Sequence, residues 1–117
     1  MTNAEIIIIA NTIAKIKADD RKLPVRLSYA LNKNLAALLE AYKPYEESYK
    51  DLGIENPDGD LTPEQNDKLG ELKLLSVDVD LYKVSLEDIL QADLTINELE
   101  VIQTYILNDE KEAAGNG

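Results

Sequence analysis

The chain has 117 residues, of which 44% are hydrophobic and 30% are charged, and it contains no histidine and no cysteine. This length is that of one domain, and the apolar share can fill one modest core. The missing residue types remove the commonest general base and metal ligand, the thiolate nucleophile and every disulfide. The composition therefore excludes zinc clusters and catalysis by cysteine or histidine, and no cofactor or enzymatic activity is predicted.

The net charge of −11 is distributed unevenly along the chain. Residues 1–50 hold eight basic and six acidic residues, whereas residues 51–117 hold four lysines and seventeen acidic residues. An acidic surface repels phosphate backbones and anionic lipids, so neither direct nucleic-acid binding nor membrane binding is expected. The acidic half is interpreted first as a solubilising surface, and second as a nucleic-acid mimic that fills a basic groove on a partner.

The first predicted helix runs from about residue 3 to residue 18. Thr2 followed by Glu5 has the pattern of a capping box, and the isoleucines that follow recur at helical spacing. Ile8 points away from this apolar face, which makes it a candidate protein contact. The favoured alternative is that a second element covers Ile8. The β-branched run also leaves a strand as a minor alternative.

A long second helix is predicted to begin at Pro24 and to end at Gly53. Pro44 lies inside it, removes one backbone hydrogen bond and predicts a kink near residues 40–43. Apolar side chains repeat at spacings of four and three, which is typical of a helix packed lengthwise on another helix. The members of this seam are Leu31, Leu35, Leu38, Tyr42, Tyr45, Tyr49 and Leu52.

The three tyrosines of the seam have two interpretations. Tyrosine is enriched at protein interfaces, so a contact surface for a partner is one of them. Packing inside the chain is the favoured one. The candidate protein contacts are therefore Ile8, Tyr42, Tyr45 and Tyr49.

A loop rich in Gly, Pro and Asp is predicted at residues 53–62, followed by a helix at 63–75. The next segment, VDVDLYKV at residues 77–84, alternates apolar and polar side chains, which predicts a half-buried strand. A lone strand cannot satisfy its backbone, so it needs a partner. The candidates are residues 59–62, residues 22–27 and a second copy of the chain.

A short helix or turn at 86–91 and a last helix at 96–108 complete the predicted elements. The predicted fold class is α+β and mainly helical. The long kinked helix packs on the first and last helices, and a small β element lies around residues 77–84. One globular domain is expected over residues 1–108, with a flexible acidic tail at 109–117.

Neither carboxylate cluster is predicted to hold a metal. Residues 56–60 resemble the start of a calcium loop, but Leu61 replaces the required glycine and Asp67 the final glutamate. Asp78 and Asp80 share one side of the predicted strand, where solvated acids are far commoner than a cation site or an acid/base pair. If the acids act as a mimic, the candidate acidic surface is Asp58, Asp60, Asp78, Asp80, Glu87 and Asp88.

Several phrases carry a family resemblance: TNAEIIIIANTI, KLPVRLSYALNKNL, KPYEE, VDVDLYKVSLEDI and ELEVIQTYI. From about Thr2 to Ile106 the chain resembles a family of small uncharacterised proteins of tailed phages and prophages of Gram-positive bacteria. The family brings no catalytic motif. Its genes often lie near structural and lysis modules, which implies a role in the tail or in assembly.

The predicted function is that of a non-enzymatic small phage protein that contacts a phage structural protein or a host protein. It acts in tail or virion assembly or as a phage accessory. The alternative is an acidic inhibitor that blocks a host defence or nucleic-acid-binding protein by DNA mimicry. The expected location is the host cell cytoplasm, with the virion as the alternative, and homo-oligomers are left open.

Overall fold

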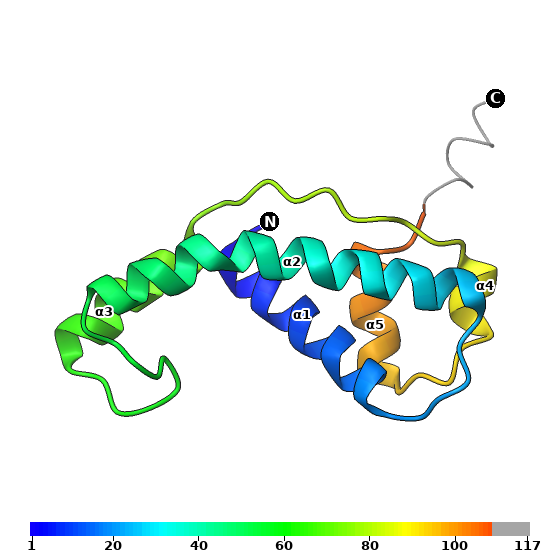
Figure 1. The fold of residues 1–117 in the computed structure, drawn as a ribbon, viewed down its shortest axis with the longest axis horizontal. Coiled ribbons are helices and arrows are strands. Elements are labelled where there is room, and N and C mark those ends of the chain that lie inside the picture. The colour runs from blue at the N-terminus through cyan, green and yellow to red at the C-terminus, as the bar shows by residue number, and fades with distance from the viewer. Residues whose placement is uncertain (109–117) are drawn as a thin grey trace.

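The computed structural model describes residues 1–108, and within that range it contains five helices and no strand. The predicted tail at 109–117 lies outside the described residues. Four helices match the predicted bounds within two residues, and the last ends three residues earlier than predicted. The helices are α1 (Asn3–Ala18), α2 (Val25–Asp51), α3 (Pro63–Leu74), α4 (Leu86–Leu90) and α5 (Ile96–Tyr105) (Figure 1).

Local side-chain caps explain where four of the helices begin. A threonine at the start accepts from a backbone N–H one turn on, and a Glu or Gln reaches back to the threonine's own N–H. Ser85 caps α4 in the same way, by accepting from the backbone N–H of Asp88 at 3.3 Å. The predicted helix starts are therefore confirmed. The reciprocal pairs are Thr2 with Glu5, Thr62 with Gln65 and Thr95 with Glu98.

The main core surrounds α1, which contacts α2, α3 and α5. Its four inward isoleucines are fully buried, and so are Leu31 and Leu38 of α2. The predicted packing of the long helix on the first helix is confirmed. α5 packs most closely on α1 and α4. Its buried Ile102 and Ile106 share the main core with side chains of α2, but the backbones of α5 and α2 do not run side by side. The predicted lengthwise packing of the long helix on the last helix was therefore wrong. The inward isoleucines of α1 are Ile6, Ile9, Ile13 and Ile16.

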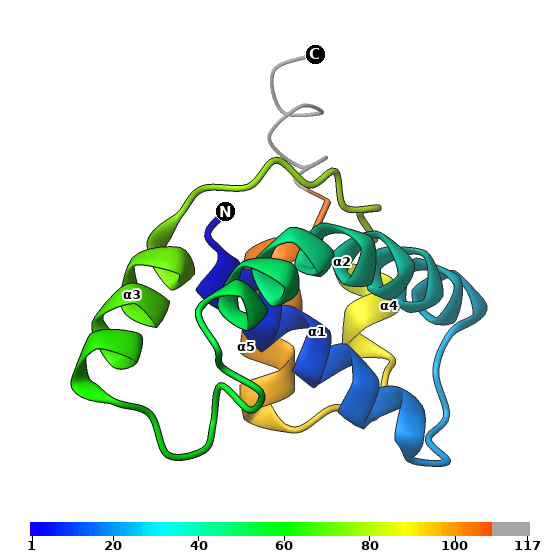
Figure 2. The ribbon, with the colours of Figure 1, turned by 60° about the vertical axis from the view of Figure 1, so that its left-hand side comes forward.

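A second, smaller core lies between the carboxyl-terminal half of α2 and α3 (Figure 2). It consists of Tyr45, Tyr49, Ile54 and Leu69. α2 continues through Pro44 as one helix, and the Ser48 hydroxyl donates to the Pro44 carbonyl at 2.7 Å. The kink predicted near 40–43 stays a prediction. Because α2 spans both cores, it connects the two ends of a molecule that is 50 Å long.

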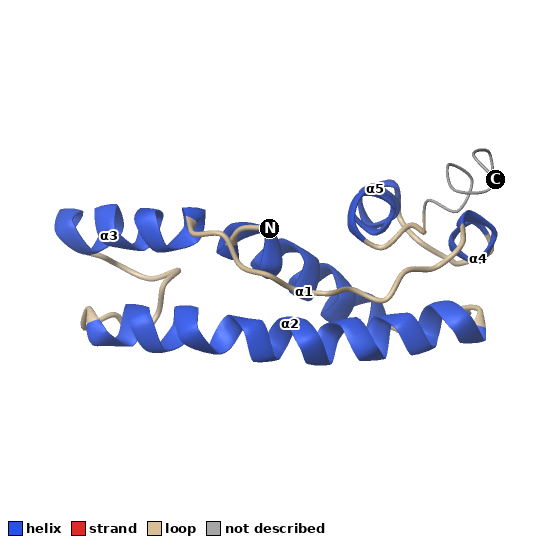
Figure 3. Cartoon of the chain, turned by 90° about the horizontal axis from the view of Figure 1, so that it is seen from above, coloured by secondary structure: helices blue, strands red, loops and turns tan. Residues whose placement is uncertain are grey.

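The predicted α+β class was wrong, because residues 77–84 are extended without forming a strand. Figure 3 shows no strand in the described chain. Isolated bridges join Thr2 to Ser76 and Val84 to Leu107, so neither 59–62 nor 22–27 is the partner. The segment instead passes over α2, whose backbone groups are already used inside the helix (Figures 1 and 3).

Side chains and residues near the two chain ends, rather than a sheet, provide hydrogen-bond partners for the backbone groups of residues 77–84. The buried Asn34 of α2 accepts from the Tyr82 N–H at 2.6 Å and donates to the Tyr82 carbonyl at 2.9 Å. At one end of the segment, the Val77 N–H donates to the Met1 carbonyl at 2.6 Å. At the other end, the Val84 N–H donates to the Ile106 carbonyl at 2.9 Å. The alternation thus predicted which side chains face inward but not what pairs with the backbone.

A buried ion pair fixes the turn between α1 and α2 to the start of α5. The Arg21 guanidinium donates to both carboxylate oxygens of Glu98, with 3.0 Å to Oε2, and to Asp19 at 2.6 Å. Glu98 is only 4% exposed and also accepts from the Thr95 N–H at 2.9 Å. The Arg21 hydrogen bonds lower the pKa of Glu98 from 4.5 to about 2.

This lowered pKa predicts a loss of stability in acid. A carboxyl whose folded-state pKa lies below its ordinary value stabilises the fold above that ordinary value, and the stabilisation disappears as pH falls. The contribution of Glu98 should therefore fade between about pH 4.5 and about pH 2. Glu98→Gln keeps an oxygen for the cap but has no charge to lose. Urea unfolding should show the parent more stable than Glu98→Gln at pH 7, with the difference shrinking towards pH 2.

The exposed Glu100 on the same helix provides the matched control. Glu100→Gln should show a small difference from the parent that varies little over the same pH range. A Glu98→Gln difference that stays constant from pH 7 to pH 2 would contradict the assigned ion pair.

Candidate functional site

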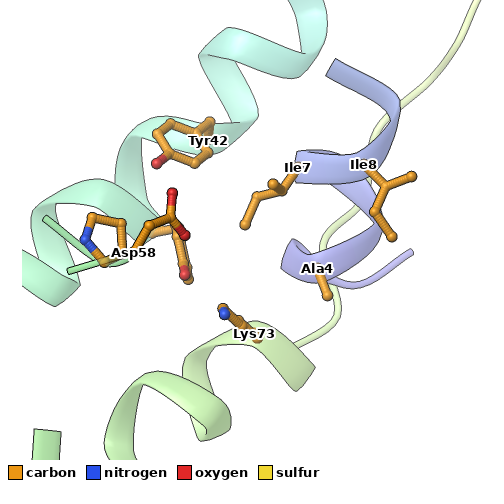
Figure 4. Close-up of a pocket in the computed structure, with 8 residues that line it drawn as sticks. Ala4, Ile7, Ile8, Tyr42, Asp58 and Lys73 are labelled. Carbon is orange, nitrogen blue, oxygen red and sulfur yellow. The ribbon is translucent and has the colours of Figure 1, made fainter. Parts of the chain in front are cut away.

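A groove of about 250 Å³ opens where α1, α2, α3 and the loop after α2 converge. Most of its lining is apolar or aromatic, and it carries one acidic and one basic side chain (Figure 4). Concave apolar sites with a few polar groups are typical places for a ligand or a partner side chain. The groove is lined by Ala4, Ile7 and Ile8 of α1, Tyr42 and Tyr45 of α2, Pro57 and Asp58 of the loop, and Lys73 of α3.

The apolar part of the groove combines exposed and buried side chains. Ile8 is 51% exposed, so no second element covers it in the described chain. On the other wall the rings of Tyr42 and Tyr45 lie 5.4 Å apart, and Tyr45 is only 2% exposed. Ile7 points towards Tyr42, whereas Ile8 points away from it (Figure 4). Ile8 therefore lies at the rim of the groove, and the lining Tyr45 belongs to the smaller core.

The hydroxyl of Tyr45 is buried and has no hydrogen-bond partner among the described residues. Leaving a buried hydroxyl unpaired costs about 1–3 kcal/mol, and such groups in folded proteins call for an explanation. Burial raises the pKa of Tyr45, and the nearby Tyr49 and Asp58 add to the rise. Tyr45 therefore lines the groove, and its hydroxyl is a neutral group without a hydrogen-bond partner among the described residues.

Two opposite charges lie on different walls of the groove. Asp58 comes from the loop and Lys73 from α3, and neither forms an ion pair within the described residues (Figure 4). The loop holds its shape because the Asn56 side chain accepts from the Asp58 N–H at 3.0 Å. Gly53, at φ 79°, reverses the chain after α2 in a conformation that favours glycine. The turn therefore places Asp58 in the lining of the groove.

The predicted contact residues divide in the structure. Ile8, Tyr42 and Tyr45 line the groove, whereas Tyr49 is buried below it in the smaller core. Lys73 and Pro57 were missed, because their place in the groove depends on how α3 folds back on α2. Ile7 was not among the predicted contacts, although an apolar residue next to Ile8 was a usable signal.

The six candidate acids do not gather at one place. They lie on the loop before α3, along the extended segment over α2 and on α4 (Figure 1). Asp88 also accepts from the Ser85 hydroxyl at 3.1 Å as part of the α4 cap. Within residues 1–108, no three or more acidic side chains come close enough together to hold a metal ion. Of the six, Asp58 lines the groove.

No family model, curated protein or solved structure matches this chain. The resemblance to a phage protein family therefore stays a prediction based on the quoted phrases. None of the helices in residues 1–108 combines the length and the apolar character needed to cross a bilayer.

Proposed function

We propose that this chain is a non-enzymatic phage protein that binds a phage structural protein through the groove, during tail or virion assembly. The observation that carries the proposal is the unpartnered hydroxyl of Tyr45, a residue of the groove lining. The hydroxyl is covered in the free protein. On this proposal the groove opens when the partner docks, and a peptide carbonyl of the partner then accepts from the hydroxyl, which offsets the cost of leaving it unpaired. On this proposal the protein works in the host cytoplasm during assembly, or within the virion.

The rest of the lining favours an extended protein segment with an apolar side chain. Ile7 and Tyr42 would enclose that side chain, with Ile8 at the rim, and tyrosines in such places contribute strongly to interfaces. Asp58 and Lys73 lie on different walls of the groove. A peptide N–H or a basic group of the partner suits Asp58, and a carbonyl or an acid suits Lys73. The cavity holds about one large side chain at 250 Å³, which fits an anchor residue better than a cofactor.

The first test compares two exposed isoleucines. A tagged protein carrying Ile8→Glu and a matched Ile96→Glu control, both at exposed helical positions, are produced in infected or lysogenic cells. Ile96 lies at the start of α5, away from the groove. The parent and Ile96→Glu should capture one phage structural protein, identified by mass spectrometry. Ile8→Glu should lose it because a charge would enter the apolar rim.

The second variant separates binding from folding. Tyr45→Phe removes the unpartnered hydroxyl, so it should melt at least as high as the parent while capturing less of the same protein. Equal capture by Ile8→Glu and Ile96→Glu, with both variants folded, would contradict the proposal. Capture of a nucleic-acid-binding host protein instead, lost when Asp78, Asp80, Glu87 and Asp88 become amides, would support the alternative of DNA mimicry.

A further inference from the structure

A second surface, on the outer side of α2, combines exposed aromatic rings with cations that form no ion pair among residues 1–108, although the Lys83 ammonium donates to the Tyr105 carbonyl at 2.6 Å. Tyr29 and Tyr82 are 54% and 43% exposed, and their rings meet edge to face at 5.3 Å. The Lys33 ammonium lies 5.4 Å from the centre of the Tyr82 ring and 5.9 Å from that of Tyr29. Arg26 and Lys83 line a cavity that also includes Tyr82. We call Arg26, Tyr29, Lys33, Tyr82 and Lys83 the basic patch.

The basic patch is held in place before anything binds. The buried Asn34 bonds both the N–H and the carbonyl of Tyr82, so this exposed ring lies on a fixed backbone. Rigid aromatic side chains lose little entropy on binding and make strong anchors. None of the three cations pairs with a carboxylate among residues 1–108, although Asp88 lines the same cavity and bonds Ser85.

The same chain contains a surface of opposite charge. Residues 51–67 hold six acidic residues and no basic residue, and all six acids are exposed. Glu64 pairs with Lys68, just beyond the segment, at 3.1 Å, and the other five form no ion pair among residues 1–108. Residues 21–39, which include the start of α2, hold four basic residues and no acid. The six acids are Asp51, Glu55, Asp58, Asp60, Glu64 and Asp67.

These two surfaces cannot meet within one molecule. The acidic segment follows the far end of α2, and the basic patch lies near its beginning (Figure 1). The long axis of the molecule measures 50 Å. The Debye length at physiological salt is about 8 Å, so the overall repulsion between two acidic copies is screened while charges in contact still attract.

We infer that the acidic segment 51–67 of one copy docks on the basic patch of the next, in a head-to-tail contact between copies of this chain. The two surfaces differ, so the contact is heterologous and can extend beyond a dimer. The inference does not rest on the partner proposed for the groove, although Asp58 belongs to both surfaces. Figure 1 shows α3 and the loop before it at the opposite end of the molecule from α4, so the acidic segment and the basic patch are well separated within each copy.

Two charge-reversal variants test the inference in the full chain. Arg26→Glu with Lys33→Glu disables the patch, and Glu55→Lys with Asp60→Lys disables the acidic segment without touching the groove lining. Sedimentation velocity over a concentration series should show the parent associating beyond dimers, and less so in high salt. Each variant alone should associate at least about tenfold more weakly, because like charges then face each other.

Mixing the two variants gives the decisive result. The first retains an intact acidic segment and the second an intact patch, so the mixture should form a dimer that does not grow further. Circular dichroism and melting curves check that both variants fold. A parent that remains monomeric, or a parent whose association is unchanged by either variant, would overturn the inference. A dimer of the parent that never extends would also overturn it, because that is the signature of an isologous contact.

Discussion

Leu38→Ala is expected to lower the free energy of unfolding by about 2–5 kcal/mol. Leu38 has no exposed surface and lies in the main core between α2 and α1. Shortening it removes buried apolar surface and leaves a cavity that the packed isoleucines of α1 cannot fill. Urea or thermal unfolding of the purified variant measures the loss.

The adjacent Leu39 provides the matched control, because the same substitution can be made one residue along the same helix. Leu39 is 52% exposed, so Leu39→Ala should change the unfolding free energy by less than about 1 kcal/mol. If Leu38→Ala melts within a degree or two of Leu39→Ala, the seam of α2 is not core.

Asn34→Leu is expected to cost about 2–4 kcal/mol, although it replaces a polar side chain by an apolar one of similar size. The substitution removes both hydrogen bonds to Tyr82 and leaves an N–H and a carbonyl of the extended segment without partners. Chemical unfolding gives the stability, and amide exchange should show faster exchange at Tyr82. Asn32→Leu, at an exposed position two residues away, should do neither.

A different outcome for Asn34 would change the account of residues 77–84. If Asn34→Leu is as stable as the parent and the Tyr82 amide exchanges no faster, the side chain does not hold the segment. The extended conformation would then depend on the bridges at its two ends.

Local signals were sufficient for the helices. Thr95 and Glu98 are three residues apart and cap each other, so the start of α5 could be predicted without knowing the rest of the fold. The same holds for Thr62, where Pro63 begins α3. Such contacts depend on neighbouring residues, and the sequence displays them directly.

Contacts between distant residues were not predictable in the same way. The alternation at 77–84 indicates two faces, but a sheet and the side of a helix can both cover the apolar one. Asn34 offered a faint signal, since a polar residue at helical spacing from Leu31 and Leu38 suggests a buried hydrogen bond. Its partner, Tyr82, lies 48 residues further along the chain.

The lining of the groove could not be predicted for the same reason, because it brings together residues that are distant in the sequence. Ile8 was identified because it points away from its own helix face, and Tyr42 and Tyr45 because they form a stripe. Nothing in their spacing indicates that they line one groove or that Lys73 joins them. The missing partner of the Tyr45 hydroxyl depends on three-dimensional packing and emerges only from the structure.

The most direct test of the central claim is site-specific photo-crosslinking at the groove. A photoreactive amino acid replaces Ile8 at the rim, or Ile96 as the exposed control, and the protein is irradiated in infected cells. We expect position 8 to yield one discrete adduct with a phage structural protein, and position 96 to yield none with that protein. Tyr45→Phe in the same background should reduce the adduct. Equal crosslinking from both positions, or no adduct from position 8 while the tagged parent still captures the protein, would contradict the groove as the docking site.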